Sequence, residues 1–182
     1  AAFMIGDTGS GATFIANGGR HDFTNVMIVG FSGSSNSLTV TNGATVASAF
    51  GTLGANGDAS NNTVLVAGAG SVWANSADLF VGYGGSGNRL VISSGGRAAA
   101  SAGLIGLDVD SSNNSVLVTG SSSVWTNSAD LYVGVSGSGN SLVISNGGEV
   151  FVGTNLVISA FAGASNNLVS ISGGSLTVTN GQ

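Results

Sequence analysis

The sequence predicts an all-β fold: a right-handed, single-stranded parallel β-helix (β-solenoid) of about seven coils, averaging 26 residues and three short strands per coil. Two observations support this prediction. A segment recurs almost unchanged after 52 residues, since SVWANSADLFVGYGGSGNRLVISSGG begins at Ser71 and SVWTNSADLYVGVSGSGNSLVISNGG begins at Ser123. Asparagines recur at half that interval. Such repeats are typical of stacked units that share one core, so residues 1–182 are predicted to form a single domain.

The first strand of each coil follows a recurring asparagine. These asparagines are Asn36, Asn62, Asn88, Asn114, Asn140 and Asn167. Aliphatic residues stand two positions after the first five (Leu38, Val64, Leu90, Val116 and Leu142) and four positions after them (Val40, Val66, Ile92, Val118 and Ile144). A spacing of two residues is the period of a β-strand, in which alternate side chains share one face. The two columns therefore predict a strand, as at 140–145, that faces the core.

Glycine-rich corners separate the other two strands. The second strand follows a Gly-Gly or Gly-Ser corner, as at 71–74 or 149–152, and the third ends at a hydrophobic-glycine pair, as at 79–82 or 131–134. The step from this glycine to the next asparagine alternates between 6 and 8 residues, and the return step alternates between 18 and 20. Since turns tolerate insertions, two extra residues are predicted at each of two corners in every second coil. Seven coils about 4.8 Å apart give a rod about 34 Å long.

Two inward columns are predicted to stabilise the stack. The recurring asparagines, Asn36 through Asn167, are expected to form a ladder in which each side-chain amide bonds to the next. The alternative is that each asparagine caps its own turn. A second column consists of Ala47, Trp73, Ala99, Trp125 and Phe151. Here small residues are expected to leave room in the core for the large rings of the neighbouring coils, and the alternative is a sugar-stacking platform.

Composition excludes several kinds of partner. Only 6% of the residues are charged, the net charge is −5, and three arginines are the only strong bases. They cannot neutralise nucleic-acid phosphates or an anionic membrane surface. No apolar run is long enough for a membrane-spanning helix, so no membrane insertion is expected. The chain has no cysteine, which excludes disulfides and is compatible with export. An extracellular or bacterial cell-surface location is therefore expected.

No catalytic, cofactor-binding or metal-binding residue is predicted. His21 is the only histidine and is expected in a solvated turn. Asp108 and Asp110 could coordinate calcium, but equivalent corners lack them, which favours a solvated loop. Asp78 and Asp130 stand two coils apart, about 9.6 Å by the sheet spacing. That separation suits an inverting glycosidase, but the repeat accounts for the pair without catalysis, so the chain is predicted not to be an enzyme.

The segment LYVGVSGSGNSLVISNGG, residues 131–148, resembles the repeat shared by autotransporter (type V secretion) passengers and PEP-CTERM-associated surface proteins. Variants begin at Leu79 and Val29, and the resemblance covers nearly the whole chain. It implies an exported, right-handed β-helix with an adhesive or structural role, and it brings no catalytic residues.

The two ends of the sequence resemble incomplete coils. Residues Ala2, Phe3, Met4 and Ile5 resemble a third strand, and residues Leu176, Val178 and Asn180 resemble a second strand. An end placed before a start would complete a coil, so these residues are predicted to form a head-to-tail junction between copies of the chain. The alternative is that the sequence is an excerpt from a longer solenoid.

The predicted function is structural: a rod segment or subunit of an extracellular fibre whose main partner is another copy of itself. Apolar outward residues (Leu65, Val91, Leu117 and Val143) add lateral association, or cover by another element, to this prediction. The alternative is an adhesin-like module that binds glycans, which exposed aromatic residues on one face would favour. A polysaccharide lyase or hydrolase is less favoured, because no acids and bases break the repeat within one groove.

Overall fold

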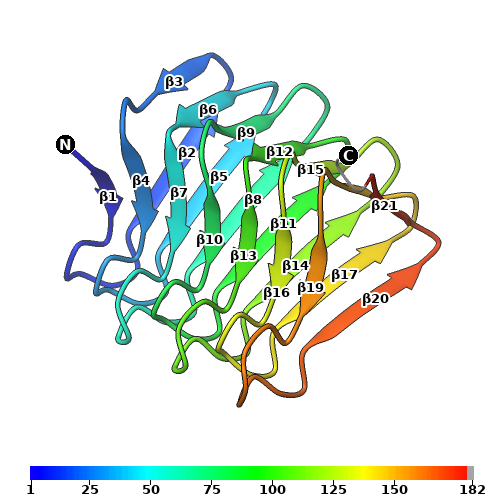
Figure 1. The fold of residues 1–182 in the computed structure, drawn as a ribbon. Helices are drawn as coiled ribbons and strands as arrows, with labels where there is room; N and C mark the ends of the chain where they lie inside the picture. Colours follow the sequence, from blue (N-terminus) through cyan, green and yellow to red (C-terminus); the bar gives the residue numbers. More distant parts are fainter. Residues whose placement is uncertain (180–182) are drawn as a thin grey trace.

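The computed structural model describes residues 1–179, and in this range the chain forms the predicted parallel β-solenoid. These residues contain 21 strands and no helix. The chain passes through three sheets in turn, so each sheet receives one strand from every coil (Figure 1). Strands three apart in chain order pair in parallel. The coils therefore stack into a rod with three flat sides and three corners.

Each sheet has seven strands. Sheet A contains β1 (Phe3–Ile5), β4 (Val26–Val29), β7 (Phe50–Leu53), β10 (Leu79–Val81), β13 (Gly103–Ile105), β16 (Leu131–Val133) and β19 (Leu156–Ile158). Sheet B contains β2 (Thr13–Asn17), β5 (Ser37–Thr41), β8 (Thr63–Ala67), β11 (Arg89–Ser93), β14 (Ser115–Thr119), β17 (Ser141–Ser145) and β20 (Leu168–Ser172). Sheet C contains β3 (Arg20–Asp22), β6 (Thr45–Ser48), β9 (Val72–Asn75), β12 (Arg97–Ala100), β15 (Val124–Asn127), β18 (Glu149–Val152) and β21 (Ser175–Val178).

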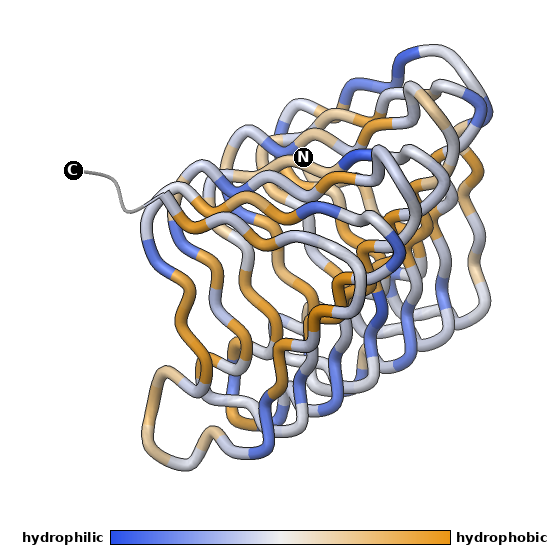
Figure 2. The backbone as a smooth tube through the Cα atoms, turned by 90° about the vertical axis from the view of Figure 1, so that its right-hand side faces the viewer, coloured by the Kyte–Doolittle hydropathy of each residue, from blue (hydrophilic) through white to orange (hydrophobic). Residues whose placement is uncertain are grey.

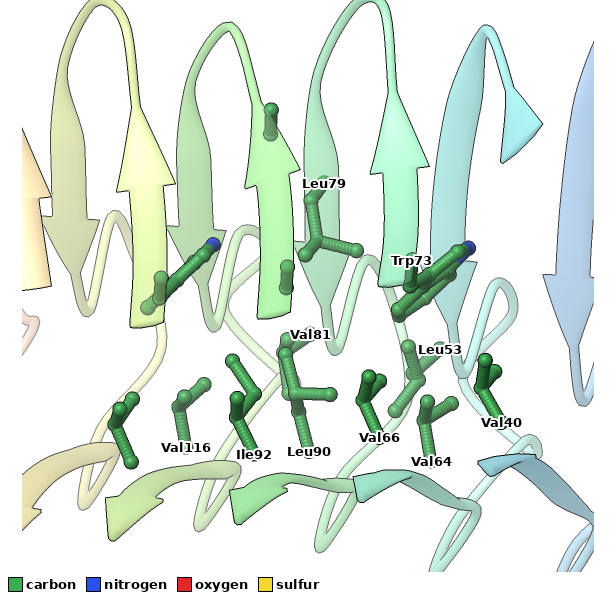
Figure 3. Packing of buried hydrophobic residues seen from close by; sticks show 14 of the residues in the cluster. Val40, Leu53, Val64, Val66, Trp73, Leu79, Val81, Leu90, Ile92 and Val116 are labelled. Carbon is green, nitrogen blue, oxygen red and sulfur yellow. The ribbon is translucent and has the colours of Figure 1, made fainter. Parts of the chain in front are cut away.

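Sheet B has the predicted register. Leu90 pairs with Val64 in one neighbouring coil and with Val116 in the other. The ten aliphatic residues of the two predicted columns are fully buried. Figure 3 shows several of them side by side, beneath strands of the other two sheets. Burying each of these side chains stabilises the stack by roughly 1.5–3 kcal/mol.

In sheet C, the predicted inward column is wrong for its alanines and its phenylalanine, which lie one residue after the true inward positions. The inward column is His21, Val46, Trp73, Ala98, Trp125, Val150 and Leu176. Ala47, Ala99 and Phe151, which the fixed spacing places in this column, face outward instead. Both tryptophans are fully buried, so neither can stack on a sugar. The column is still one of large and small core residues, but its small members are Val46 and Ala98.

Single-residue insertions at two corners cause this shift. The corner between sheets B and C spans 94–96 before β12 but 68–71 before β9. The corner between sheets C and A spans 101–102 after β12 but 76–78 after β9. The sequence predicts two extra residues at a single corner, but one lies at the corner before the sheet C strand and the other at the corner after it. This shifts the strand by one residue relative to the fixed spacing, so every side chain of the strand moves to the opposite face. The gain of two residues at the corner between sheets A and B is confirmed.

A glycine in sheet A makes room for each tryptophan. A Cβ on Gly103 would lie 2.6 Å from Cζ2 of Trp125 and 2.9 Å from Cδ1 of Leu131, closer than carbon atoms approach. Gly51 has the same relation to Trp73. Each glycine lies 22 residues before its tryptophan, less than one turn of the solenoid, so the two residues meet inside the core from sheets A and C. Large and small residues thus alternate between coils, which explains why the repeat is complete only after two coils.

Candidate functional site

The recurring asparagines form the predicted ladder. Oδ1 of Asn62 accepts hydrogen bonds from the backbone N–H and the side-chain amide of Asn36, at 2.9 and 3.0 Å. Asn62 donates in the same way to Asn88, and the pattern continues through Asn114 and Asn140 to Asn167. The bonded backbone belongs to the preceding coil, so the alternative of a local turn cap is wrong. Bonds of this kind satisfy amides that are otherwise fully buried.

Each ladder asparagine packs against a glycine of the preceding coil. Gly82 has a φ of +80°, and a Cβ built on it would overlap the side-chain amide of Asn114. The same contact occurs six times, between Gly6, Gly30, Gly54, Gly82, Gly106 and Gly134 and, in order, Asn36, Asn62, Asn88, Asn114, Asn140 and Asn167. The glycine of each hydrophobic-glycine pair and a ladder asparagine therefore contact each other between coils. The sequence shows both repeats but not their contact.

The two ends of the ladder differ. At the N-terminal edge Ala12 holds the ladder position, and only its backbone N–H donates to Oδ1 of Asn36, at 2.8 Å. At the other edge the side-chain amide of Asn167 donates to the carbonyl of Gly137 and to Oγ of Ser159. From Asn36 to Asn140, each asparagine donates to the coil that follows it. Because Ala12 has no acceptor in its side chain, a coil stacked before it finds no ladder partner there.

Aromatic rings fill the interior at the N-terminal edge. The predicted junction residues Ala2, Phe3, Met4 and Ile5 lie in β1 or beside it. Ile5 is buried, whereas Met4 faces outward and is 40% exposed. Phe3 stacks on Phe23 with the ring centroids 4.3 Å apart, and it meets Phe14 edge-on at 5.4 Å. Three phenylalanines therefore fill this edge of the core together with the buried Ile5 and Ala16.

The core is open at the C-terminal edge. Leu176 and Val178 lie in β21 and continue the inward columns of sheet C. Val178 remains 38% exposed, and the inward residues Ile158 and Ile171 remain 45% and 49% exposed. Asn180, the last predicted junction residue, lies outside the described residues.

His21 lies in strand β3, contrary to the prediction of a solvated turn. It occupies the inward column of sheet C and is half-buried. Its Nε2 lies 3.1 Å from the carbonyl oxygen of Gly18, and its ring meets Phe14 edge-on at 6.0 Å. An edge strand has no coil on one side, so the ring keeps access to water and a polar side chain is tolerated at a core position.

Asp130 closes the corner between sheets C and A. Its Oδ1 accepts hydrogen bonds from the hydroxyl of Thr154 and from the backbone and side-chain nitrogens of Asn155, and its Oδ2 accepts one from the hydroxyl of Tyr132. The bond from Thr154, followed by that from Asn155, lowers the pKa of Asp130 from its ordinary value of 3.8. The contact with Asp130 raises the pKa of Tyr132. These bonds favour the charged carboxylate, whereas a general acid needs a raised pKa.

The other aspartates singled out in the sequence lie at corners. Oδ1 of Asp78 accepts a hydrogen bond from the backbone N–H of Ala102. Asp108 and Asp110 lie in the loop between β13 and β14, where the backbone carbonyls of both accept hydrogen bonds from the same loop. In the part of the chain that the structure describes, no group of three or more acidic, histidine or cysteine side chains is placed to hold a metal ion.

An open groove of about 430 Å³ lies at the corner between sheets C and A, near the N-terminal edge. Arg20 and Asp22 form an ion pair at its rim, with 2.8 Å between Nη2 and Oδ1. Its buried polar residues bond to each other, since the hydroxyl of Ser48 donates to Oδ1 of Asn75 at 2.9 Å. Across residues 1–179, no helix is long and apolar enough to cross a membrane.

The outer surface of sheet A is apolar along most of the rod. Its outward column is Met4, Ile28, Thr52, Phe80, Leu104, Tyr132 and Val157, and the column at the next corner is Asp7, Phe31, Ala55, Tyr83, Leu107, Val135 and Ala160. We name these two columns face A. Phe80 meets Tyr83 edge-on at 5.2 Å, and Tyr83 is 43% exposed. The signal in the sequence is the residue between the two inward positions of each third strand, which belongs to no predicted core column.

The outer surface of sheet B has the predicted apolar column. Its central residues are Ile15, Thr39, Leu65, Val91, Leu117, Val143 and Ser170. We name the outward residues of sheet B face B. Leu65, Val91, Leu117 and Val143 are half-buried, and serine and threonine make up most of the columns beside them. Hydrophobic and hydrophilic residues recur at similar places around successive coils, as Figure 2 shows.

No protein-family model, curated protein or solved structure matches the chain. The open edges, the ladder and the two apolar faces are therefore the features from which a function can be derived.

Proposed function

We propose that this chain is a structural rod of an extracellular fibre, in which copies join end to end by strand pairing. One observation carries the proposal. All three sheets end in unpaired strands at both edges of the described chain: β1, β2 and β3 at one edge, and β19, β20 and β21 at the other (Figure 1). Unpaired edge strands present free N–H and C=O groups that pair with further strands. Because every sheet is parallel, a copy moved along the rod axis presents its edge strands in the matching direction.

The inward side chains at the two edges also match each other in a stacked pair of copies. The inward residues at the C-terminal edge are Leu156, Ile158, Val169, Ile171, Leu176 and Val178, and those at the N-terminal edge are Phe3, Ile5, Phe14, Ala16, His21 and Phe23. In a stacked pair the same columns continue, so Ile171 meets Ala16 and Val169 meets Phe14. Stacking removes from water an apolar cross-section that a single copy leaves exposed, and this burial favours association.

The junction lacks one contact that every internal pair of coils has. Ala12 occupies the ladder position of the first coil, so the asparagine ladder stops there. A junction between copies is therefore held by strand pairing and core contact but by no amide–amide bond. We expect the fibre to dissociate at these junctions before any coil within a copy unfolds.

An extracellular location is part of the proposal. It is supported by the resemblance of the repeat to secreted passengers and surface proteins, and the low proportion of charged residues and the lack of cysteine are compatible with it. The corner aspartates and the groove offer no set of residues that favours catalysis over this structural role.

Electron microscopy and analytical ultracentrifugation of the purified chain test the proposal. The parent chain should form unbranched filaments whose length increases with concentration. Ile171→Lys places a charge on the open core at the C-terminal edge and should leave single short rods. Thr126→Lys, at an exposed outward position of β15, is the matched control and should form filaments like the parent. Short rods of the parent chain at every concentration would contradict end-to-end assembly and leave the edges to neighbouring coils of a longer chain.

A further inference from the structure

We infer that the rods also associate side by side, with face A of one copy packed against face B of a second copy. The starting observation is face A itself, an apolar and partly aromatic surface along most of the rod. Met4, Phe31 and Tyr83 are 36–43% exposed and most other members are half-buried, while Ile28, Thr52 and Val135 are buried. Soluble proteins rarely leave a continuous apolar surface of this size in water unless it binds something. The charges, dimensions and periodicity of the two faces identify the occupant as another copy.

Face A has an apolar centre and an acidic rim. Asp78 and Asp130 lie on one side of it, at the corner between sheets C and A. Asp58, Asp108 and Asp110 lie on the other side, in the loops between sheets A and B. An apolar centre with a polar rim is the usual anatomy of a protein interface.

The acidic rim decides which face of the second copy is favoured. Two A faces packed together would bring aspartates close to aspartates along both borders, and like charges across an interface oppose association. On face B the only charged outward residue among the described strands is Arg89. Its border toward sheet A is formed by the same loops that carry Asp58, Asp108 and Asp110, whereas its border toward sheet C, at corners such as 94–96 and 120–123, carries no charged residue. Face B therefore presents aspartates to the acidic rim along one border only, whereas a second face A presents them along both.

The dimensions of the two faces also match. Each face takes one strand from each of seven coils, so both are about 34 Å long with side chains repeating every 4.8 Å or so. The five-residue strands of face B are about 16 Å wide, which gives roughly 500 Å² per copy and about 1,000 Å² in total. This area is at the lower limit for a specific interface. A second solenoid is the partner whose ridges have the same spacing and can fit between those of face A.

Pairing of two different faces has a consequence for the assembly. Each rod uses face A toward one neighbour and face B toward another, so association does not stop at a dimer and can continue into a bundle or layer. The inference does not depend on end-to-end stacking, because neither face includes the inward residues at the edges. Lateral pairing and filament growth can therefore fail separately.

Disulfide trapping tests the inference, because the chain has no cysteine of its own. Leu104→Cys places a thiol on face A, and Leu117→Cys, in a copy with a size tag, places one on face B. Ala99→Cys, on the outward side of sheet C, is the matched control. After mixing and mild oxidation, the Leu104–Leu117 mixture should give mixed dimers well above the statistical ratio. The Ala99 variant should give few dimers with either partner.

A charge reversal adds a second readout that leaves the cysteines in place. Arg89→Glu, in the Leu117→Cys copy, should reduce the yield of mixed dimers, with circular dichroism confirming that the variant keeps its strands. Three outcomes would overturn the inference: Leu104→Cys copies linking to each other as readily as to Leu117→Cys copies, the Ala99 control linking equally well, or the mixture staying unlinked. The last outcome would assign face A to a different partner, such as a glycan.

Discussion

At the scale of single residues, the contact between asparagine and glycine holds successive coils together. The ladder asparagine accepts two hydrogen bonds through one oxygen, from the backbone and from the side chain of the preceding asparagine. Glycine lies against it because any Cβ would occupy the space of the amide. The amides are buried, and a buried donor or acceptor that loses its partner is costly. The contact therefore fixes the register of the coils as well as stabilising them.

Asn114→Ala is expected to lower the free energy of unfolding by about 2–5 kcal/mol, since it leaves the backbone N–H and the side-chain amide of Asn88 buried without an acceptor. Denaturant unfolding followed by circular dichroism measures the change. Asn36→Ala is the matched control in the same column. It removes an acceptor only from the backbone N–H of Ala12, so its cost should be about half as large. Equal costs for the two variants would show that the ladder is not what stabilises the central coils.

The carboxylate of Asp130 is expected to make stability depend on pH in the acid range. Its pKa is lowered in the folded chain, so its contribution is fully present above 3.8 and is lost as the pH falls through the lowered pKa. Asp130→Asn should therefore destabilise the chain more at pH 7 than at pH 2.5. The side chain is partly exposed to solvent, which screens its interactions, so the difference should stay below about 1 kcal/mol. Denaturant unfolding at the two pH values measures it, and an identical cost at both would contradict the role of the charge.

At the scale of strands and coils, the repeat has two alternating kinds of coil. One kind carries a tryptophan in sheet C, which packs against a glycine 22 residues earlier in sheet A. The lengths of the corners also alternate from one coil to the next, which allows each tryptophan to face inward. The side-chain packing of the core therefore repeats every two coils, whereas the hydrogen-bonding pattern between coils repeats with every coil.

Gly103→Ala is expected to destabilise the chain by about 1–3 kcal/mol, because the added methyl group meets the ring of Trp125 in a packed core. Gly103 does not have a positive φ, so the cost comes from packing and not from the backbone. The pair Gly103→Ala and Trp125→Leu should together cost less than the sum of the two single changes, since leucine leaves room for the methyl group. Denaturant unfolding of the three variants forms the cycle. Additive costs would show that the two residues do not pack against each other.

At this scale, the sequence predicts a column of stacked residues correctly only where no corner of variable length separates them from the repeating marker. In sheet B the asparagine and the aliphatic residues lie close together in the sequence, so no insertion separates them and the predicted columns are correct. Trp73 and Ala99 are separated by corners of unequal length, and the count of 26 does not show which corner holds an extra residue. One residue is enough to exchange the two faces of a strand. This is why Ala47, Ala99 and Phe151 were assigned to the wrong face.

At the scale of the whole molecule, each coil contacts only the coils on either side. Stability in such a stack is close to a sum over neighbouring contacts, so the edges are weaker than the centre. The edges also expose core residues, as Ile158 and Ile171 show. The proposed fibre and the proposed lateral contact both cover surfaces that a single rod leaves in water.

Ile144→Ala and Ile171→Ala remove the same atoms from two positions of one inward column. Ile144 is fully buried in β17, so its loss should cost about 2–5 kcal/mol. Ile171 is 49% exposed at the C-terminal edge, and its loss should cost about 1 kcal/mol or less in separate rods. Denaturant unfolding at concentrations where copies stay apart measures both. Equal costs would indicate that the edge coil is already covered, either by another copy or by a segment of the chain itself.

The sequence by itself determined the solenoid, its period, the register of sheet B and the asparagine ladder, because each follows from residues at fixed spacings: two residues within a strand and about 26 between coils. Only the tertiary structure decided which sides of sheet C face inward, which glycine meets which asparagine, how His21 and the phenylalanines fill one edge, and where face A lies. Those features depend on contacts between coils, and coils are joined by corners whose lengths vary. Stacking brings together residues whose separation along the chain does not reveal that they touch.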